Sequence, residues 1–89
     1  MAGPTVKCLV MMIRTPAFDP RVIPAHLCFL DDLRERGMLE QSGPFTDGTG
    51  GAYVLKVRSY NQALFVAEQD PLNLQDCSTI TVREWKSGP

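Results

Sequence analysis

A chain of 89 residues is long enough for one small domain and too short for a two-domain enzyme with a cleft between its lobes. Nine Lys and Arg against ten Asp and Glu give a formal charge of −1, and the longest basic cluster is "RER" at 34–36, which argues against nucleic acid as a main partner. We therefore predict a single domain over residues 1–89, with a core over about 6–85, and neither a nucleic-acid nor a membrane partner.

The cysteines and the longest apolar run indicate the cytoplasm. Cys8, Cys28 and Cys77 are an odd number without CxxC spacing, which fits reduced thiols better than a disulfide framework. The apolar run "CLVMMI" at 8–13 is too short for a signal-peptide core or a membrane span. One histidine and scattered cysteines give no metal-ligand spacing, so we predict no metal and no cofactor.

The first two predicted elements are a central strand and a helix. Residues 6–13 are apolar at both alternating sets of positions, which is typical of a strand covered on both faces. Residues 14–20 form a loop, and the pattern from there to Gly37 predicts a helix whose regular part begins near Pro24. The inward stripe of this helix consists of residues three and four apart: Val22, His26, Phe29, Leu30 and Leu33.

A pair of strands is predicted next. Residues 38–45 are extended in character and are broken by Gly43 and Pro44, which indicates an edge strand. The segment "TDGTGG" at 46–51 favours a turn, and the alternating pattern of residues 52–58 predicts the third strand.

The last third of the chain predicts a helix and a strand. Ser59, with Gln62 three residues later, forms a capping box that begins the second helix. We expect this helix to run to about Asp70, where Pro71 stops it. Residues 77–85 are rich in β-branched side chains and alternate in polarity, so they predict the fourth strand.

This order of elements predicts an α+β, ferredoxin-like βαββαβ fold, with an antiparallel four-stranded sheet and two helices on one face. The uncovered face should be polar, yet the first strand is apolar toward both faces. In so short a chain the simplest cover is a second copy of the same chain. We therefore predict a homodimer that packs sheet against sheet.

His26 and Asp70 are the candidate catalytic residues. His26 lies on the apolar stripe of the first predicted helix, and Asp70 is expected on the inward face at the end of the second. A buried carboxylate needs a partner, and a histidine paired with it has the fixed tautomer that a general acid or base requires. A single histidine on an apolar face is more often a core residue, and both interpretations stay open on these positions alone.

The segment "SGPF" at 42–45 is a second candidate region, for substrate binding. Gly43 allows the backbone to approach a ligand closely, and Ser42 supplies a hydroxyl beside main-chain donors. A turn into a hairpin explains the same residues, so the segment does not identify a site without a partner.

Several segments also resemble a known family. Those similar to the YciI-like (YCII-related) family are "HLCFLDDLRERGMLEQSGPF" at 26–45, "AYVLKVRS" at 52–59, Asp70-Pro71 and "REW" at 83–85. The resemblance spans about Val6 to Trp85 and implies a ferredoxin-like fold that dimerises through its sheets as a dimeric α+β barrel.

The resemblance further implies a site in which a histidine and an aspartate share a pocket, here His26 and Asp70, with Ser42 and Gly43 beside them. One departure is the proline-rich segment "DPRVIP" at 19–24, where an arginine-containing helical start is expected. We assign Arg21 of this segment to substrate binding.

The residues and the resemblance together predict a small enzyme of the elimination or isomerisation type. In this hypothesis His26, oriented by Asp70, exchanges a proton with a small organic, possibly cyclic, compound, and main-chain amides near Ser42 and Gly43 stabilise a developing negative oxygen. The alternative is a non-catalytic dimeric module that binds a metabolite or a protein partner.

Overall fold

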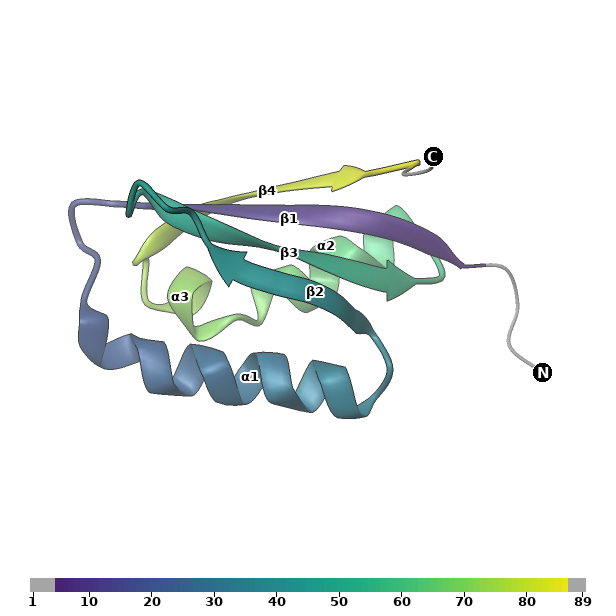
Figure 1. Cartoon of the computed structure of the whole chain (residues 1–89), viewed down its shortest axis with the longest axis horizontal. Helices are drawn as coiled ribbons and strands as arrows, with labels where there is room; N and C mark the ends of the chain where they lie inside the picture. Colours follow the sequence, from purple (N-terminus) through teal and green to yellow (C-terminus); the bar gives the residue numbers. More distant parts are fainter. Residues whose placement is uncertain (1–4, 87–89) are drawn as a thin grey trace.

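Four antiparallel strands form the sheet in the computed structural model of the chain, which describes residues 5–86 (Figure 1). Their order across the sheet is β2-β3-β1-β4, and the helices lie on one face. The elements are, in chain order, β1 (Val6–Arg14), the 3-10 helix η1 (Pro20–Val22), α1 (Ile23–Glu35), β2 (Leu39–Pro44), β3 (Gly50–Val57), α2 (Tyr60–Glu68), α3 (Pro71–Leu74) and β4 (Ser78–Glu84). This arrangement confirms the predicted α+β, ferredoxin-like fold.

The core lies between the sheet and the helices. Alternate residues of β1, namely Cys8, Val10 and Met12, are almost completely buried on this side. Val10 is opposite Tyr53 of β3 and Val82 of β4, so side chains from three strands form one layer. The helices complete the core with Leu30, Leu33, Ala63, Ala67 and Leu72.

The entry to α1 follows the prolines of the sequence. Asp19 accepts a hydrogen bond from the backbone N–H of Arg21 (2.9 Å) and so caps η1. The α-helix begins at Ile23, directly before Pro24, as the restricted backbone of proline predicts. Gly37, with a φ of 74°, redirects the chain after the helix. These local signals fix where α1 begins and ends.

The end of the second helix differs from the prediction. α2 ends at Glu68, and a further short helix, α3, begins at Pro71, so Asp70 lies between the two. Proline disfavours the helical conformation in the residue before it, and Asp70 is accordingly extended (φ −61°, ψ 131°). The Asp70 carboxylate accepts a hydrogen bond from the backbone N–H of Leu72 (2.9 Å) and caps α3. Asp70 therefore reaches the interior from the start of a helix, and not from the α2 stripe.

The open face of the sheet, opposite the helices, has an apolar centre. Leu9, Met11 and Ile13 of β1 alternate with the buried residues and so point to this face. Val54 of β3 is opposite Leu9 and adds to the same patch. Ile13 is 43% exposed, and no helix within residues 5–86 covers this face (Figure 1).

Two glycines of the sheet, one closely packed and one not, provide a test of the fold. A Cβ atom on Gly50 would lie 1.8 Å from the carbonyl oxygen of Met12, whereas a Cβ on Gly43 would meet nothing within 4 Å. We expect Gly50→Ala to lower the free energy of unfolding by more than about 2 kcal/mol, since the backbone of β1 must move. Gly43→Ala is the matched control, expected within about 0.5 kcal/mol of the wild type. Urea unfolding measures both, and equal stability would contradict the close approach.

Candidate active site

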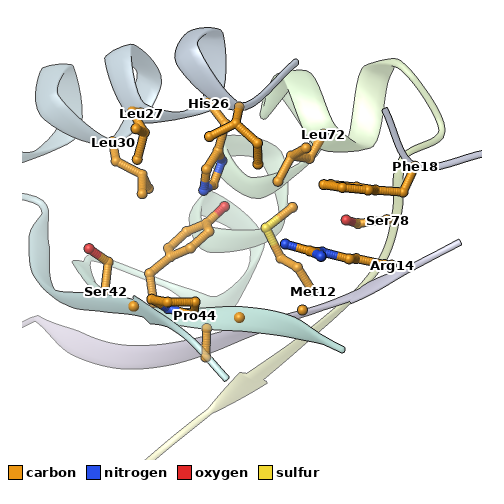
Figure 2. Close-up of a pocket in the computed structure, with 16 residues that line it drawn as sticks. Met12, Arg14, Phe18, His26, Leu27, Leu30, Ser42, Pro44, Leu72 and Ser78 are labelled. Carbon is orange, nitrogen blue, oxygen red and sulfur yellow. The ribbon is translucent and has the colours of Figure 1, made fainter. Parts of the chain in front are cut away.

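A cavity of about 450 Å³ lies between α1 and the sheet (Figure 2). The facing strands β2 and β3 form the wall opposite α1, and the adjoining ends of β1, β4 and α3 complete the lining. Most of the lining is apolar, and the side chains with polar groups are Arg14, His26, Ser42, Tyr53 and Ser78. A mostly apolar cavity with a few convergent polar groups is typical of a site for a small organic molecule.

His26 and Asp70 meet at the wall of this cavity. The Nδ1 atom of His26 lies 2.9 Å from each carboxylate oxygen of Asp70, although the two residues are 44 positions apart. The Asp70 side chain is completely buried, and that of His26 is 13% exposed. The structure thus brings together the two side chains that the sequence analysis paired.

The Asp70 carboxylate is held by three different parts of the chain. It accepts hydrogen bonds from His26 of α1, from the backbone N–H of Leu72 and from the hydroxyl of Tyr53 on β3 (3.3 Å to Oδ2). When the neutral imidazole donates its Nδ1 proton to Asp70, its Nε2 atom carries the free lone pair. Figure 2 shows the His26 ring projecting from α1 toward the sheet, with the cavity around its tip.

Tyr53 is a component that the sequence analysis treated only as a strand residue. Its ring is buried in the core layer, and its centroid is 6.4 Å from that of His26. Burial raises the pKa of Tyr53 above its ordinary value, and the negative charge of Asp70 and the hydrogen bond to it act in the same direction. The phenol therefore stays protonated and remains a donor to the carboxylate. A tyrosine on the inward face of a central strand was the signal, since a buried hydroxyl needs a partner.

Ser42 and Gly43 line the cavity from β2, as the sequence analysis anticipated for this segment. The Ser42 side chain points from the strand into the space below α1 (Figure 2). Gly43 continues this wall together with Gly50 and Gly51 of β3. The three glycines form a side-chain-free surface, named here the glycine floor, that a flat molecule can approach closely.

Arg21 is not brought to the cavity. Its guanidinium binds the carboxylate of Asp19 (2.8 Å), and its side chain is 89% exposed. This hydrogen-bonded pairing holds the pKa of Asp19 below its ordinary value. The substrate contact that we expected for Arg21 therefore finds no support in the geometry. The arginine that lines the cavity is Arg14.

Arg14 and Ser78 were both missed from the sequence. Arg14 ends β1 on the same side as Met12, and Ser78 begins β4 as its Cα partner. A charged residue on the core-facing side of a strand end was the available signal, but the sequence alone did not show that strand pairing places it beside Ser78 at the cavity.

Metal-binding and membrane-spanning features are absent from the described part of the chain. Within residues 5–86, no group of three or more His, Cys, Asp or Glu side chains is arranged to hold a metal ion. None of the helices in this range is long and apolar enough to cross a membrane.

Comparison with known proteins gives a family, a relative and two similar structures. Residues 7–86 match the family of the YCII-related domain. The "Uncharacterized protein YjpA" of Bacillus subtilis (strain 168) is 38% identical over 78 residues, which cover 88% of this chain and 92% of that protein.

The two similar structures share the fold. One is 5-chloro-2-hydroxyhydroquinone dehydrochlorinase (TftG) from Burkholderia phenoliruptrix AC1100, in complex with 2,5-dihydroxybenzoquinone. Its TM-score is 0.76 at 22% identity, over 92% of this chain and 95% of that chain. The hydroxynitrile lyase from Passiflora edulis (PeHNL) has a TM-score of 0.50 at 16% identity, over 99% of this chain and 100% of that chain.

The buried hydrogen bond of Tyr53 predicts a pH-dependent stability. Tyr53→Phe should lower the free energy of unfolding at neutral pH by about 1 to 2 kcal/mol, because Asp70 loses a donor. The raised pKa of Tyr53 means that its contribution is present below the unfolded pKa of about 10 and is lost as the pH rises above it. The variant should therefore lose less stability than the wild type between about pH 9 and about pH 11.

Urea unfolding at both pH values checks this expectation. Tyr60→Phe is the matched control, because Tyr60 is 39% exposed and has no hydrogen bond to Asp70 within residues 5–86. A Tyr53→Phe protein with the same alkaline loss as the wild type would contradict the assignment.

Proposed function

Since the chain belongs to the family of the YCII-related domain, matched over residues 7–86, we propose that it is a small acid–base enzyme. Its substrate is a small organic, possibly cyclic, compound, and its reaction is an elimination or an isomerisation. The observation that carries the proposal is the contact of His26 Nδ1 with a fully buried Asp70 at the wall of a ligand-sized cavity.

His26 is the proton-transfer residue in this proposal. Nε2 accepts a proton from a C–H or O–H bond of the substrate, and the electrons of that bond form a new double bond. In an elimination the leaving group departs with the electron pair of its bond to the substrate, and the proton on Nε2 then passes to that leaving group or to water, which returns His26 to its neutral form. In an isomerisation the same nitrogen returns the proton to another atom, so His26 ends each turnover neutral.

Asp70 is the positioning residue for His26. It does not need to change its protonation, because its role is to hold the tautomer and orientation of the ring and to stabilise the imidazolium that forms. Its own hydrogen bonds from Tyr53 and Leu72 keep the carboxylate fixed. Ser42 and Gly43 lie in the opposite wall, where the Ser42 hydroxyl is a donor for negative charge that develops on a substrate oxygen.

The similar structures supply test compounds. The dehydrochlorinase is in complex with a flat quinone, and a cavity of about 450 Å³ accommodates a single substituted ring. The alternative, a non-catalytic module that binds a metabolite or a protein, uses the same cavity without proton transfer. Turnover that is lost when Nε2 of His26 is removed would distinguish the enzyme from the binding module.

We also propose that the chain works as a homodimer joined through the open face of the sheet. Leu9 and Met11, which are half-buried, and Ile13, which is exposed, form an apolar patch there, and a patch of this kind normally marks an interface. A second copy would cover it symmetrically.

We propose the cytoplasm as the working compartment. Cys8, Cys28 and Cys77 are free thiols, two of them buried. Burial, assisted by the charge of Glu84, raises the pKa of Cys8 and so keeps this thiol protonated. A reducing compartment suits three unpaired cysteines.

His26→Asn tests the proposed function. Asparagine retains a side-chain N–H near the position of Nδ1, so Asp70 keeps a donor, but the base at Nε2 is lost. We expect kcat to fall at least about 100-fold. Chloride release from 5-chloro-2-hydroxyhydroquinone, and deuterium uptake into a panel of hydroxylated ring compounds, measure turnover.

Circular dichroism and thermal unfolding establish that the variant folds. Cys28→Ser, on the exposed side of α1, is the control and should react like the wild type. Wild-type protein that turns over none of these compounds, while binding some of them in the cavity, would favour the binding module. Turnover that survives in His26→Asn would overturn the role of His26.

Met11→Glu tests the homodimer. A carboxylate in the centre of the apolar patch would be removed from water at a sheet-to-sheet interface, which is unfavourable, so we expect the mass in solution to fall from that of two chains to that of one. Phe65→Glu is the control, because Phe65 is 65% exposed on α2, on the other side of the sheet. Sedimentation velocity distinguishes the two, and a wild type that sediments as one chain would contradict the proposal.

A further inference from the structure

We propose that Arg14 and Ser78 form an anion-binding subsite in the cavity, so that the substrate is a flat compound carrying an anionic oxygen group such as a carboxylate. This inference rests on the proposed function, because it concerns the same cavity, and it specifies the substrate class. The anionic group lies at the Arg14 end of the cavity, and the proton to be moved lies at the His26 end.

Arg14 lines the cavity with its guanidinium stacked on an aromatic ring and without an ion pair in the described residues. Its guanidinium carbon lies 4.1 Å from the centre of the Phe18 ring, so the planar group is stacked and its orientation is restricted. Figure 2 shows the guanidinium beneath Phe18, directed toward the middle of the cavity. Within residues 5–86, Arg14, Arg58 and Arg83 have no ion pair, whereas the other arginines each bind an aspartate, and of the three only Arg14 lines the cavity.

Ser78 provides a hydroxyl next to Arg14. It is the Cα partner of Arg14 on the neighbouring strand, and it lines the same cavity. The residue is only 6% exposed, yet its hydroxyl has no hydrogen-bond partner in the described part of the chain, in contrast to Thr15, whose hydroxyl donates to the carbonyl of Asp76. Within the described residues no fully buried side-chain N or O atom lacks a partner, so the unpaired Ser78 hydroxyl is accessible from the cavity, where it is a donor available to a ligand beside a cation.

The charges around these two residues favour an anion. No Asp or Glu is among the residues that line the cavity in the range 5–86, and the carboxylate of Asp70 is engaged by His26, Tyr53 and Leu72. An anionic oxygen group would therefore meet a guanidinium and a hydroxyl without a competing negative charge. Arginine suits this task because its parallel N–H groups bind two oxygens of one carboxylate.

The remaining lining specifies the body of the ligand. The glycine floor is on one side, and Leu27 and Leu30 of α1 are on the other, so the space between them is largely apolar. A ring fits there with its faces against these surfaces. With the anionic group held at Arg14, the ring lies in the same cavity as His26, which receives the proton in the proposed reaction.

Binding of benzoate and benzamide to the full chain tests the subsite. The two probes share a flat ring and nearly the same shape, and only benzoate is charged. We expect the wild type to bind benzoate at least about tenfold more tightly than benzamide. Arg14→Gln should abolish this preference by weakening benzoate alone, and Ser78→Ala should weaken benzoate about two- to fivefold. Dissociation constants come from titrations followed by amide NMR shifts.

Arg36→Gln is the matched control, because Arg36 forms an exposed ion pair with Asp32 at the end of α1. It should keep the preference of the wild type. Failure of benzoate to bind, equal affinity of the wild type for both probes, or an Arg14→Gln protein that still prefers benzoate would each overturn the subsite. The outcome is independent of catalysis. If benzoate binding requires Arg14 but His26→Asn leaves turnover intact, the proposed function is overturned and the subsite is not.

Discussion

The buried carboxylate of Asp70 is the interaction on which the candidate site depends. A charge that is completely removed from water requires several donors, and these come from α1, from β3 and from the start of α3. Each donor belongs to a different element, so the carboxylate fixes the spacing between the helices and the sheet while it orients His26. Folding and the geometry of the proton-transfer group are therefore stabilised by the same hydrogen bonds.

The two faces of the sheet serve different purposes. On the helix side, Cys8 and Val10 form the core, and toward the end of β1 the same side opens into the cavity at Arg14. On the other side, Leu9 and Met11 remain without a cover from the described residues. The single strand β1 therefore supplies the core, one wall of the cavity and the surface proposed for dimerisation, which explains why it is apolar at nearly every position.

Local patterns predicted the elements that local chemistry determines. The proline at position 24, the capping box at Ser59 and the strand alternations gave the correct fold, and helical spacing placed His26 toward the interior. The short helix after Asp70 was missed because a proline after a helix indicates an end, whereas here it also begins the next helix. The polar lining of the cavity was incomplete because Arg14 and Ser78 become neighbours only through strand pairing. Arg21 was expected to bind substrate, but it forms a surface ion pair with Asp19, two residues before it in the chain.

The glycine floor has a consequence for how relatives of this chain can diverge in selectivity. A Cβ atom at Gly50 would collide with the β1 backbone, and one at Gly51 would approach the Gly43 carbonyl to 2.7 Å, so the β3 part of this wall resists substitution, whereas Gly43 on β2 has space for a Cβ. Leu27, which is 53% exposed on α1, has room to vary in size without disturbing the sheet. Substrate preference should therefore evolve, or be engineered, through the helix wall, while the two glycines of β3 stay the same.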